Sequence, residues 1–297
     1  MRDVDSGDAL LFPSRGIVAL LLASVSFGSS AIFIRYATEA SAISLTLFRL
    51  SIAALGMVLF ALSRRTLRLP TKRDLVLVAF SGMVLTLHFV GFIFAVKETT
   101  VANATFLVNT SPVMLAVLSP IIIRERTSSR EGLAVVVATL GVMLVAYGGN
   151  GFRAFGYGDL SALMAALFVA LYSLTGRRLR TSGITTACYT SYVYSFAAVL
   201  ALVLAEGLGG HTFRGYDTTN IIAILGLALI PTMVGHSLYN YSLGLVKIVT
   251  ANLFPLLEPV IASLFAASFF SEIPSISQVV GYSLILVSVI IVVRAFK

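Results

Sequence analysis

Ten long apolar runs fill most of the sequence, and they limit the possible fold more than any other feature. Each run holds about twenty residues, the length an α-helix needs to cross the hydrocarbon core of a bilayer. The predicted helices cover residues 16–36, 42–62, 75–96, 100–123, 132–148, 159–177, 184–206, 219–243, 249–271 and 277–294. A transmembrane barrel would instead require shorter segments of alternating polarity. The runs therefore predict an all-α membrane protein with ten transmembrane helices.

The composition agrees with a chain whose main solvent is lipid. Hydrophobic residues make up 58% of the sequence and charged residues only 11%, which leaves no stretch long enough for a separate soluble domain. The net charge of +8 is scattered through short loops, so no nucleic-acid partner is expected. Cys188 is the single cysteine and cannot form an intrachain disulfide or a cysteine metal cluster. We expect no cofactor.

The distribution of positive charge predicts how the chain sits in the membrane. With the N-terminus inside, the cytoplasmic loops and ends hold sixteen Lys and Arg residues, whereas the opposite side holds four, namely Arg35, Lys97, Arg153 and Arg214. Cytoplasmic loops carry the excess of positive charge in multi-pass proteins. Both termini are therefore predicted to be cytoplasmic. Segment 1–15 lacks the charge-then-apolar order of a cleavable signal, so the first run is expected to be retained as a helix.

Similar landmarks recur in the two halves of the chain at shifts of 147 to 150 residues. The pairs are His88 and His236, Val-Lys at 96–97 and 246–247, Pro-Val at 112–113 and 259–260, and Glu125 and Glu272. Five predicted spans separate matching landmarks, so the two copies should cross the membrane in opposite directions. Inverted repeats are typical of secondary carriers that enclose a site between the halves. The landmarks divide the chain into a cytoplasmic segment (1–15), repeat 1 (16–148), an external linker (149–158) and repeat 2 (159–297). A repeat also records gene duplication, which channels share, and chance similarity is the alternative.

Several motifs resemble those of the drug/metabolite transporter superfamily, in its ten-helix members built from two five-helix repeats. They are FGSSAIFIRYA at 27–37, LTLFRLSIAAL at 45–55, SPVMLAVLSPIIIRERTSSREG at 111–132 and EPVIASLFAASFFSEIPSISQVVG at 258–281. The chain looks most like bacterial inner-membrane exporters of amino acids, particularly aromatic ones. The resemblance implies two repeats around a central cavity, a bacterial inner-membrane location and outward transport. The chain departs from that pattern because it contains no Trp and residues 167–180 keep little of the FGSSA motif.

Polar side chains inside the predicted spans are candidates for substrate binding, because such groups are costly in a membrane unless they face a cavity or a partner. His88 and His236 occupy equivalent repeat positions and offer hydrogen-bonding groups that titrate near neutral pH. The alternative for each is a structural bond to a carbonyl of a neighbouring helix. Glu258 lies between Pro255 and Pro259, where missing backbone donors should bend and partly unwind the helix. It could bind an ammonium group or a coupling proton.

An ion pair between Glu258 and Arg49, the only base well inside a span, is an equal alternative for the buried acid. Other candidates offer uncharged polar groups or aromatic walls, with packing as their alternative. The predicted substrate-binding set is His88, Phe27, Phe92, Asn109, Tyr172, His236, Tyr239, Asn240 and Glu258. Asn103 and Asn252 occupy matching repeat positions, and for them both tight helix packing and ligand contact are open. Glu125 and Glu272 end their helices and favour a capping or gating role.

These features predict a secondary transporter of small neutral or zwitterionic metabolites that works by alternating access. Amino acids are favoured by the resemblance, and nucleosides or other small metabolites are the alternative. An ion channel would require pore-lining carbonyls or charged rings. An intramembrane hydrolase built on Ser81, His88 and His236 lacks a nucleophile-elbow motif, so the chain is not expected to be an enzyme. The expected partners are a small-molecule substrate and the lipid bilayer, with the protein a monomer or homodimer and proton coupling open.

Overall fold

The computed structural model describes residues 13–150, 156–207, 215–270 and 274–294, and these residues form helices and no strand. The α-helices are α1 (Pro13–Gly28), α2 (Ser30–Tyr36), α3 (Ala42–Ser63), α4 (Lys72–Glu98), α5 (Val101–Val108), α6 (Ser111–Ile122), α7 (Ser129–Asn150), α8 (Tyr157–Thr181), α9 (Thr186–Gly207), α10 (Thr218–Leu227), α11 (Ser237–Leu243), α12 (Ile248–Leu253), α13 (Glu258–Phe270) and α14 (Ile276–Val293). A π-helix, η1 (Ala228–His236), joins α10 to α11, and a 3₁₀ turn, η2 (Pro255–Leu257), joins α12 to α13.

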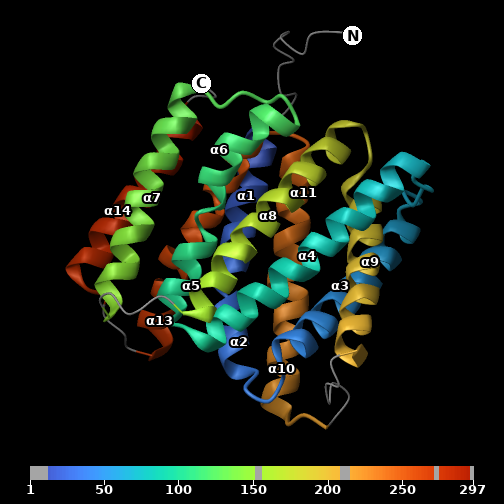
Figure 1. Cartoon of the computed structure of the whole chain (residues 1–297), viewed down its shortest axis with the longest axis horizontal. Helices are drawn as coiled ribbons and strands as arrows, with labels where there is room; N and C mark the ends of the chain where they lie inside the picture. The colour runs from blue at the N-terminus through green and yellow to red at the C-terminus, as the bar shows by residue number, and fades with distance from the viewer. Residues whose placement is uncertain (1–12, 151–155, 208–214, 271–273, 295–297) are drawn as a thin grey trace.

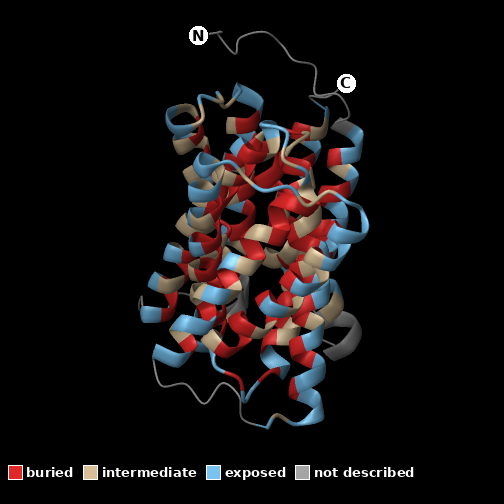
Figure 2. Ribbon diagram, turned by 90° about the vertical axis from the view of Figure 1, so that its right-hand side faces the viewer, coloured by how far each residue is buried: buried red, intermediate tan, exposed pale blue. Residues whose placement is uncertain are grey.

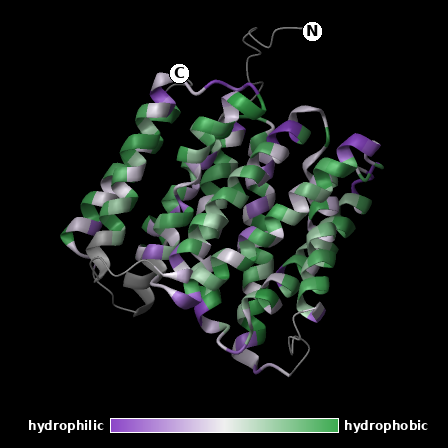
Figure 3. Cartoon of the chain, viewed as in Figure 1, coloured by the Kyte–Doolittle hydropathy of each residue, from purple (hydrophilic) through white to green (hydrophobic). Residues whose placement is uncertain are grey.

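These elements make ten candidate membrane spans, which confirms the predicted all-α, ten-helix fold. Their bounds are Ser14–Tyr36, Ala42–Ser63, Lys72–Glu98, Asn103–Ile122, Ser129–Ala146, Tyr157–Thr181, Thr186–Gly207, Thr218–Leu243, Ile248–Phe265 and Ile276–Val293. Hydrophobic residues make up most of each helix, and hydrophilic residues are more frequent at the two ends of the bundle (Figure 3). Buried residues fill the interior between the helices (Figure 2). The molecule therefore has an apolar outer face that suits lipid contact.

Four of the spans are interrupted, and the prolines at 111–120, at Pro231 and beside Glu258 predict kinks in three of them. The breaks fall at Ser29 between α1 and α2, at 109–110 between α5 and α6, at η1, and at η2. Pro112, Pro231 and Pro255 lie at the last three breaks, and proline removes a backbone donor and crowds the preceding turn. The predicted unwinding beside Glu258 is confirmed by η2. The remaining difference is the break at Ser29, which no proline marks.

The helices are arranged around α1 and α8 (Figure 1). On one side α7 packs along α14, and on the other α3 packs along α9, with α4 running between α8 and α9. The α7–α14 crossing is tight, because a Cβ atom on Gly141 would lie 2.7 Å from the carbonyl oxygen of Gly281. Small residues of this kind let membrane helices approach closely. The interrupted spans lie between these two outer pairs and supply the interior of the molecule.

Candidate functional site

A cavity lies where the interrupted spans meet. Elements from both halves of the chain line it. The first half supplies residues from α1 to α6, and the second half supplies residues from α8, η1, α11, α12, η2 and α13. The lining residues are Phe27, Ser30, Arg49, His88, Phe89, Phe92, Val108, Asn109, Ser111, Val169, His236, Tyr239, Asn252, Pro255 and Glu258. Mostly apolar walls with a few polar groups are typical of a small-molecule site.

The cavity brings together most of the substrate-binding residues predicted from the sequence. These are Phe27, His88, Phe92, Asn109, His236, Tyr239 and Glu258. Tyr172 and Asn240 differ, because both are fully buried and neither lines the cavity. Asn240 Nδ2 donates to Tyr172 Oη at 2.5 Å and to the carbonyl oxygen of His236 at 2.7 Å. Tyr172 and Asn240 therefore lie behind the wall, where Asn240 contacts the backbone of His236.

Aromatic rings surround the two histidines at the centre of the cavity. The imidazole of His236 packs edge-on against Phe27 and Phe89, with ring centroids 4.8 and 4.9 Å apart, and lies 6.3 Å from the ring of His88. His88 also stacks on Phe92 at 6.2 Å and an interplanar angle of 5°. Edge-on and stacked arrangements at these separations are favourable. The two repeat-equivalent histidines thus meet in one cluster, although 148 positions separate them in the sequence.

The hydrogen bonds of the two histidines differ. His88 Nδ1 lies 2.9 Å from the carbonyl oxygen of Ala165 on α8, and a carbonyl can only accept, so this nitrogen carries the proton and a neutral ring keeps Nε2 as an acceptor. The predicted alternative for each histidine was a structural bond to a carbonyl of a neighbouring helix. His88 makes such a bond through Nδ1. His236 Nδ1 is buried and has no hydrogen-bond partner. His236 thus keeps unused hydrogen-bonding capacity beside the cavity.

Arg49 and Glu258 both line the cavity, yet the ion pair proposed between them as an alternative is not formed. Arg49 Nε donates to Thr232 Oγ1 at 2.8 Å, and its Cζ lies 3.7 Å from the ring centroid of Phe89 in a cation–π contact. Arg49 Nη1 and Glu258 Oε1 are buried and have no hydrogen-bond partner. Thr232 and Phe89 therefore hold Arg49 in place, and Arg49 and Glu258 each keep one buried polar atom unused.

Arg49 is oriented by the π-helix. Thr232 Oγ1, which accepts from Arg49, itself donates to the carbonyl oxygen of Leu227 five residues earlier at 2.8 Å. The wider turn of η1 contains Pro231 and ends at His236. Such π-helical segments are frequent at functional sites. The local distortion of this span thus fixes both a cationic group and an imidazole at the cavity.

Sequence reasoning missed several cavity residues. Arg49 was interpreted only as a counter-ion, and Asn252 was left between packing and ligand contact. Asn252 Nδ2 donates to Tyr239 Oη at 2.5 Å, and that hydroxyl lies 2.6 Å from Ser173 Oγ. Asn252 therefore orients the tyrosine while also lining the cavity. Phe89 had no distinguishing signal in an apolar run, whereas the charge of Arg49 inside a span was a signal that pointed to the cavity.

The hydrolase alternative finds no support among its own residues. The hydroxyl of Ser81 is fully buried and lies 2.6 Å from Tyr189 Oη and 2.8 Å from Thr175 Oγ1. Neither His88 nor His236 is among its partners. A serine nucleophile needs a base within hydrogen-bond reach, so the Ser–His contact that this alternative requires is not formed. Within the described residues, no group of three or more His, Cys, Asp or Glu side chains is arranged to hold a metal ion.

A second polar network closes the end of the bundle where α1 begins. Arg177 Nε donates to Glu125 Oε2 at 2.8 Å, and the backbone amide of Ile248 donates to Glu125 Oε1 at 2.6 Å. Arg177 Nη1 also donates to the carbonyl oxygen of Leu243 at 2.7 Å. Glu125 thus caps the start of α12, as predicted for this residue, and joins the first half of the chain to the second. Glu272, its predicted counterpart, lies outside the described residues.

Glu131 adds a further link at the same end of the molecule. Its Oε1 accepts from Thr250 Oγ1 at 2.9 Å, and its Oε2 accepts from the amide and hydroxyl of Ser128 at 2.8 Å. Lys247 Nζ lies 3.7 Å from the same carboxylate. Glu131 is 4% exposed. Every carboxylate oxygen in this network therefore has a partner.

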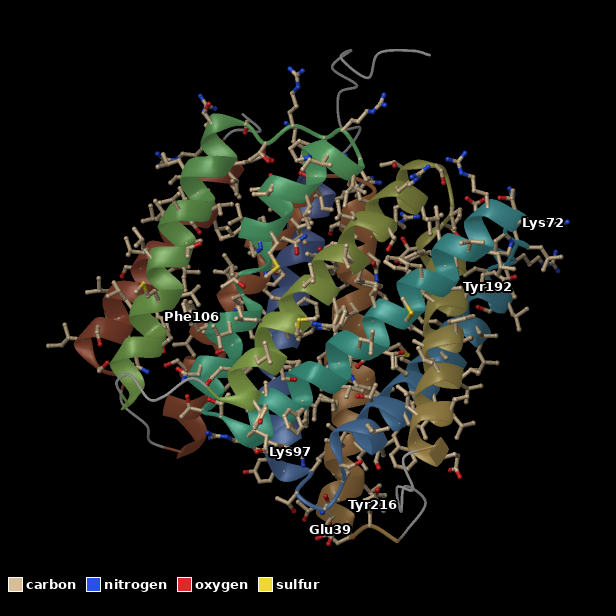
Figure 4. The ribbon with its side chains drawn as sticks, in the orientation of Figure 1. Glu39, Lys72, Lys97, Phe106, Tyr192 and Tyr216 are labelled. Atoms are coloured by element: carbon tan, nitrogen blue, oxygen red, sulfur yellow. The ribbon has the colours of Figure 1, made fainter. Side chains whose placement is uncertain are left out.

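Hydrogen bonds also join elements at the opposite end of the bundle. Lys97 Nζ donates to the carbonyl oxygens of Ala37 and Ala40 at 3.1 and 2.9 Å, and the amide of Glu39 donates to Asn220 Oδ1 at 3.1 Å. Figure 4 shows Lys97, Glu39 and Tyr216 together at this end. These contacts join α4 and α10 to the loop that follows α2.

Ten spans with a central cavity lined by both halves define a multi-pass membrane protein of the solute-carrier kind. The family model described as the EamA-like transporter family matches the chain twice, over residues 14–147 and 156–294. The two matches together cover nearly the whole sequence. The chain therefore belongs to the EamA-like transporter family, within the drug/metabolite transporter superfamily.

Curated relatives carry transporter names. The chain is 27% identical over 245 residues to the "Uncharacterized transporter YdfC" of Bacillus subtilis (strain 168), covering 80% of this chain and 77% of the relative. It is 23% identical over 285 residues to a "Probable terminal-alkyne amino-acid exporter" of Streptantibioticus cattleyicolor, covering 95% and 94%. Protein RarD of Salmonella typhi is 23% identical over 76% of this chain and 74% of its own length.

A solved crystal structure shares the fold, with a TM-score of 0.79, 17% sequence identity and coverage of 94% of this chain and 96% of the other. At that identity the likeness concerns the arrangement of helices alone. The chain is thus a multi-pass membrane transporter by family, with a lipid bilayer around it and a small molecule as its substrate.

Proposed function

We propose that the protein is a secondary transporter that moves small neutral or zwitterionic metabolites, amino acids foremost, outward across the bacterial inner membrane by alternating access. The observation that carries this proposal is the cavity at the meeting point of the interrupted spans, lined by both halves of the chain and containing polar atoms without partners. A site between two halves can open to either side when one half moves against the other.

The two family matches support an inverted repeat. Each match contains five of the ten spans, and an odd number of spans turns the second copy over in the membrane. The proposed boundaries are those of the sequence: a cytoplasmic segment at 1–15, repeats at 16–148 and 159–297, and an external linker at 149–158. Both termini are proposed to be cytoplasmic, in keeping with the excess of Lys and Arg on that side.

The closed end of the bundle supports alternating access. The network of Glu125, Arg177 and Glu131 joins the two halves at the end that the charge distribution places in the cytoplasm. We interpret this arrangement as a conformation closed toward the cytoplasm. Opening that side requires these contacts to break.

The chemistry of the cavity favours amino acids over polyanions. Its walls carry Phe27, Phe89 and Phe92, which suit an apolar or aromatic side chain. Arg49 is the one arginine or lysine among its lining residues, whereas phosphate groups are usually bound by several basic side chains. The amino-acid exporter named among the relatives points in the same direction. Nucleosides, also small and uncharged, are the second candidate class.

Flux measurements on the purified protein in liposomes test this proposal. A panel of amino acids, nucleosides and sugars would be measured with and without a pH gradient, using empty liposomes as the control. We expect saturable flux of one or more amino acids, and a dependence on the pH gradient would indicate proton coupling. Passage of ions at channel rates with no movement of small solutes would contradict the carrier proposal.

A further inference from the structure

The cavity contains one basic and one acidic side chain, Arg49 and Glu258, that form no ion pair. Arg49 comes from α3 in the first half of the chain, and Glu258 comes from the first turn of α13 in the second half. Both line the cavity, both keep one buried polar atom without a partner, and they form no ion pair. A charge inside a membrane is costly unless it is paired or solvated. An arrangement of this kind is suited to a ligand that brings the missing charges.

The surroundings of Arg49 fix its orientation in the absence of a ligand. Thr232 and the ring of Phe89 hold the Arg49 guanidinium, which leaves Nη1 unused. Glu258 lies at the N-terminal end of α13, where the helix dipole favours a carboxylate. A guanidinium can bind a carboxylate with strong, charge-assisted hydrogen bonds, and a carboxylate does the same for an ammonium group. Binding at fixed groups avoids much of the entropy cost of ordering them.

We propose that Arg49 and Glu258 bind the two opposite charges of one zwitterionic substrate, the guanidinium taking its carboxylate and Glu258 taking its ammonium group. This inference rests on the proposed transport function and gives Arg49 a direct role in substrate binding. Because the two residues belong to different halves of the chain, a bound zwitterion connects the halves through the substrate. The aromatic walls around His236 then receive the substrate side chain.

Three ligands of one shape test the inference. Phenylalanine carries both charges, phenethylamine lacks the carboxylate, and 3-phenylpropionate lacks the ammonium group. Binding to the purified full-length protein in nanodiscs would be measured by calorimetry for the wild type, Arg49→Gln and Glu258→Gln. A charge-assisted hydrogen bond in a buried site contributes about 10- to 100-fold in affinity. We therefore expect the wild type to bind phenylalanine about 10- to 100-fold more tightly than either analogue.

Each variant should lose one preference and keep the other. Arg49→Gln should bind phenylalanine and phenethylamine equally, with its affinity for phenethylamine unchanged or raised, whereas Glu258→Gln should lose its preference over 3-phenylpropionate. Arg49→Lys, which keeps the positive charge, should retain part of the preference over phenethylamine. Ligand-free melting temperature and size-exclusion profile establish that each variant is folded.

Different failures have different meanings. If the wild type binds none of the three ligands and moves no amino acid in liposomes, the proposed function and this inference both fail. If the wild type binds phenylalanine but both variants keep its ligand preferences, the inference fails while the proposed function stands. Equal wild-type affinity for phenylalanine and phenethylamine would make the cavity a site for organic cations and would also overturn the inference. An equal loss of all three ligands in both folded variants would overturn it as well.

Discussion

The charged groups of this protein fall into two regions that differ in how completely they are satisfied. At the end where α1 begins, Glu125 and Glu131 have partners for every carboxylate oxygen. In the central cavity, Arg49 and Glu258 face a shared space with unused polar atoms and no ion pair. Buried polar groups are normally hydrogen-bonded, so the first region is typical of structure and the second of binding. The two sets of charges should therefore respond differently to substitution.

The largest loss of stability is expected at the closed end, from Arg177→Met. This substitution removes the partner of Glu125 and leaves a carboxylate that is only 18% exposed beside the start of α12. Breaking a buried charge pair from one side costs about 3–5 kcal/mol, and the partial exposure here lowers the expectation to about 2–3 kcal/mol. The melting temperature of the detergent-solubilised protein checks this. The double variant Glu125→Gln, Arg177→Met is the control and should recover part of the loss.

In the cavity, Glu258→Gln should leave the ligand-free melting temperature unchanged or higher. The substitution removes a charge that has no ion-pair partner, and removal of such a charge costs little or stabilises the protein. Thermal melting with and without substrate makes the comparison, since substrate should no longer raise the melting temperature of the variant. A loss as large as that of Arg177→Met would show that Glu258 is a structural charge, and the contrast between the regions would disappear.

At His88 we expect a moderate loss of transport efficiency. Replacement with Ala removes the bond to Ala165 and the stacking on Phe92, each a contribution of about 1 kcal/mol. We expect a roughly fivefold to thirtyfold loss in transport efficiency, measured as the initial rate of flux against substrate concentration. The variant His88→Asn, which can keep a donor near the Nδ1 position, should lose less. Unchanged kinetics in His88→Ala would remove this residue from the binding site.

The smallest effect belongs to Lys247, which also lies at the closed end. Its ammonium group is 44% exposed and 3.7 Å from Glu131, and such an exposed pair contributes about 0–1 kcal/mol. Lys247→Met should therefore change the melting temperature little, because Glu131 keeps Thr250 and Ser128 as partners. A loss comparable to that of Arg177→Met would mean that the lysine, and not the hydrogen-bond network, holds this end closed.

Most of the fold followed from the sequence because the lipid environment imposes it. A span must satisfy its backbone internally and must be apolar for about twenty residues, so ten runs predict ten helices. The breaks at Pro231 and Pro255 also had a local cause, the missing backbone donor. The prolines at 111–120 likewise predicted a kink in the fourth span, although the break itself falls at 109–110, just before Pro112 in the first turn of α6.

The site was partly predictable for a different reason. Polar residues such as His88 and Glu258 stand out in an apolar run, and the cost of burying them in lipid predicted that they face a cavity. Phe89 lacks that signal because phenylalanine also packs against lipid and core. The choice between an Arg49–Glu258 ion pair and separate charges depends on how η1 and η2 place the two residues, and no pattern in the sequence encodes that distance. Tyr172 and Asn240 give the same signal, a polar side chain in an apolar run, but they lie behind the wall of the cavity and do not line it.

The most direct test of the central claim is substrate counterflow in proteoliposomes. Vesicles loaded with unlabelled phenylalanine are diluted into a trace of labelled phenylalanine, and uptake of the label is followed over time. A cavity that opens alternately to the two sides predicts a transient accumulation of label above its equilibrium level in the wild type, and none in Glu258→Gln. Uptake that rises to equilibrium without an overshoot in the wild type would indicate a continuous pore and would contradict alternating access.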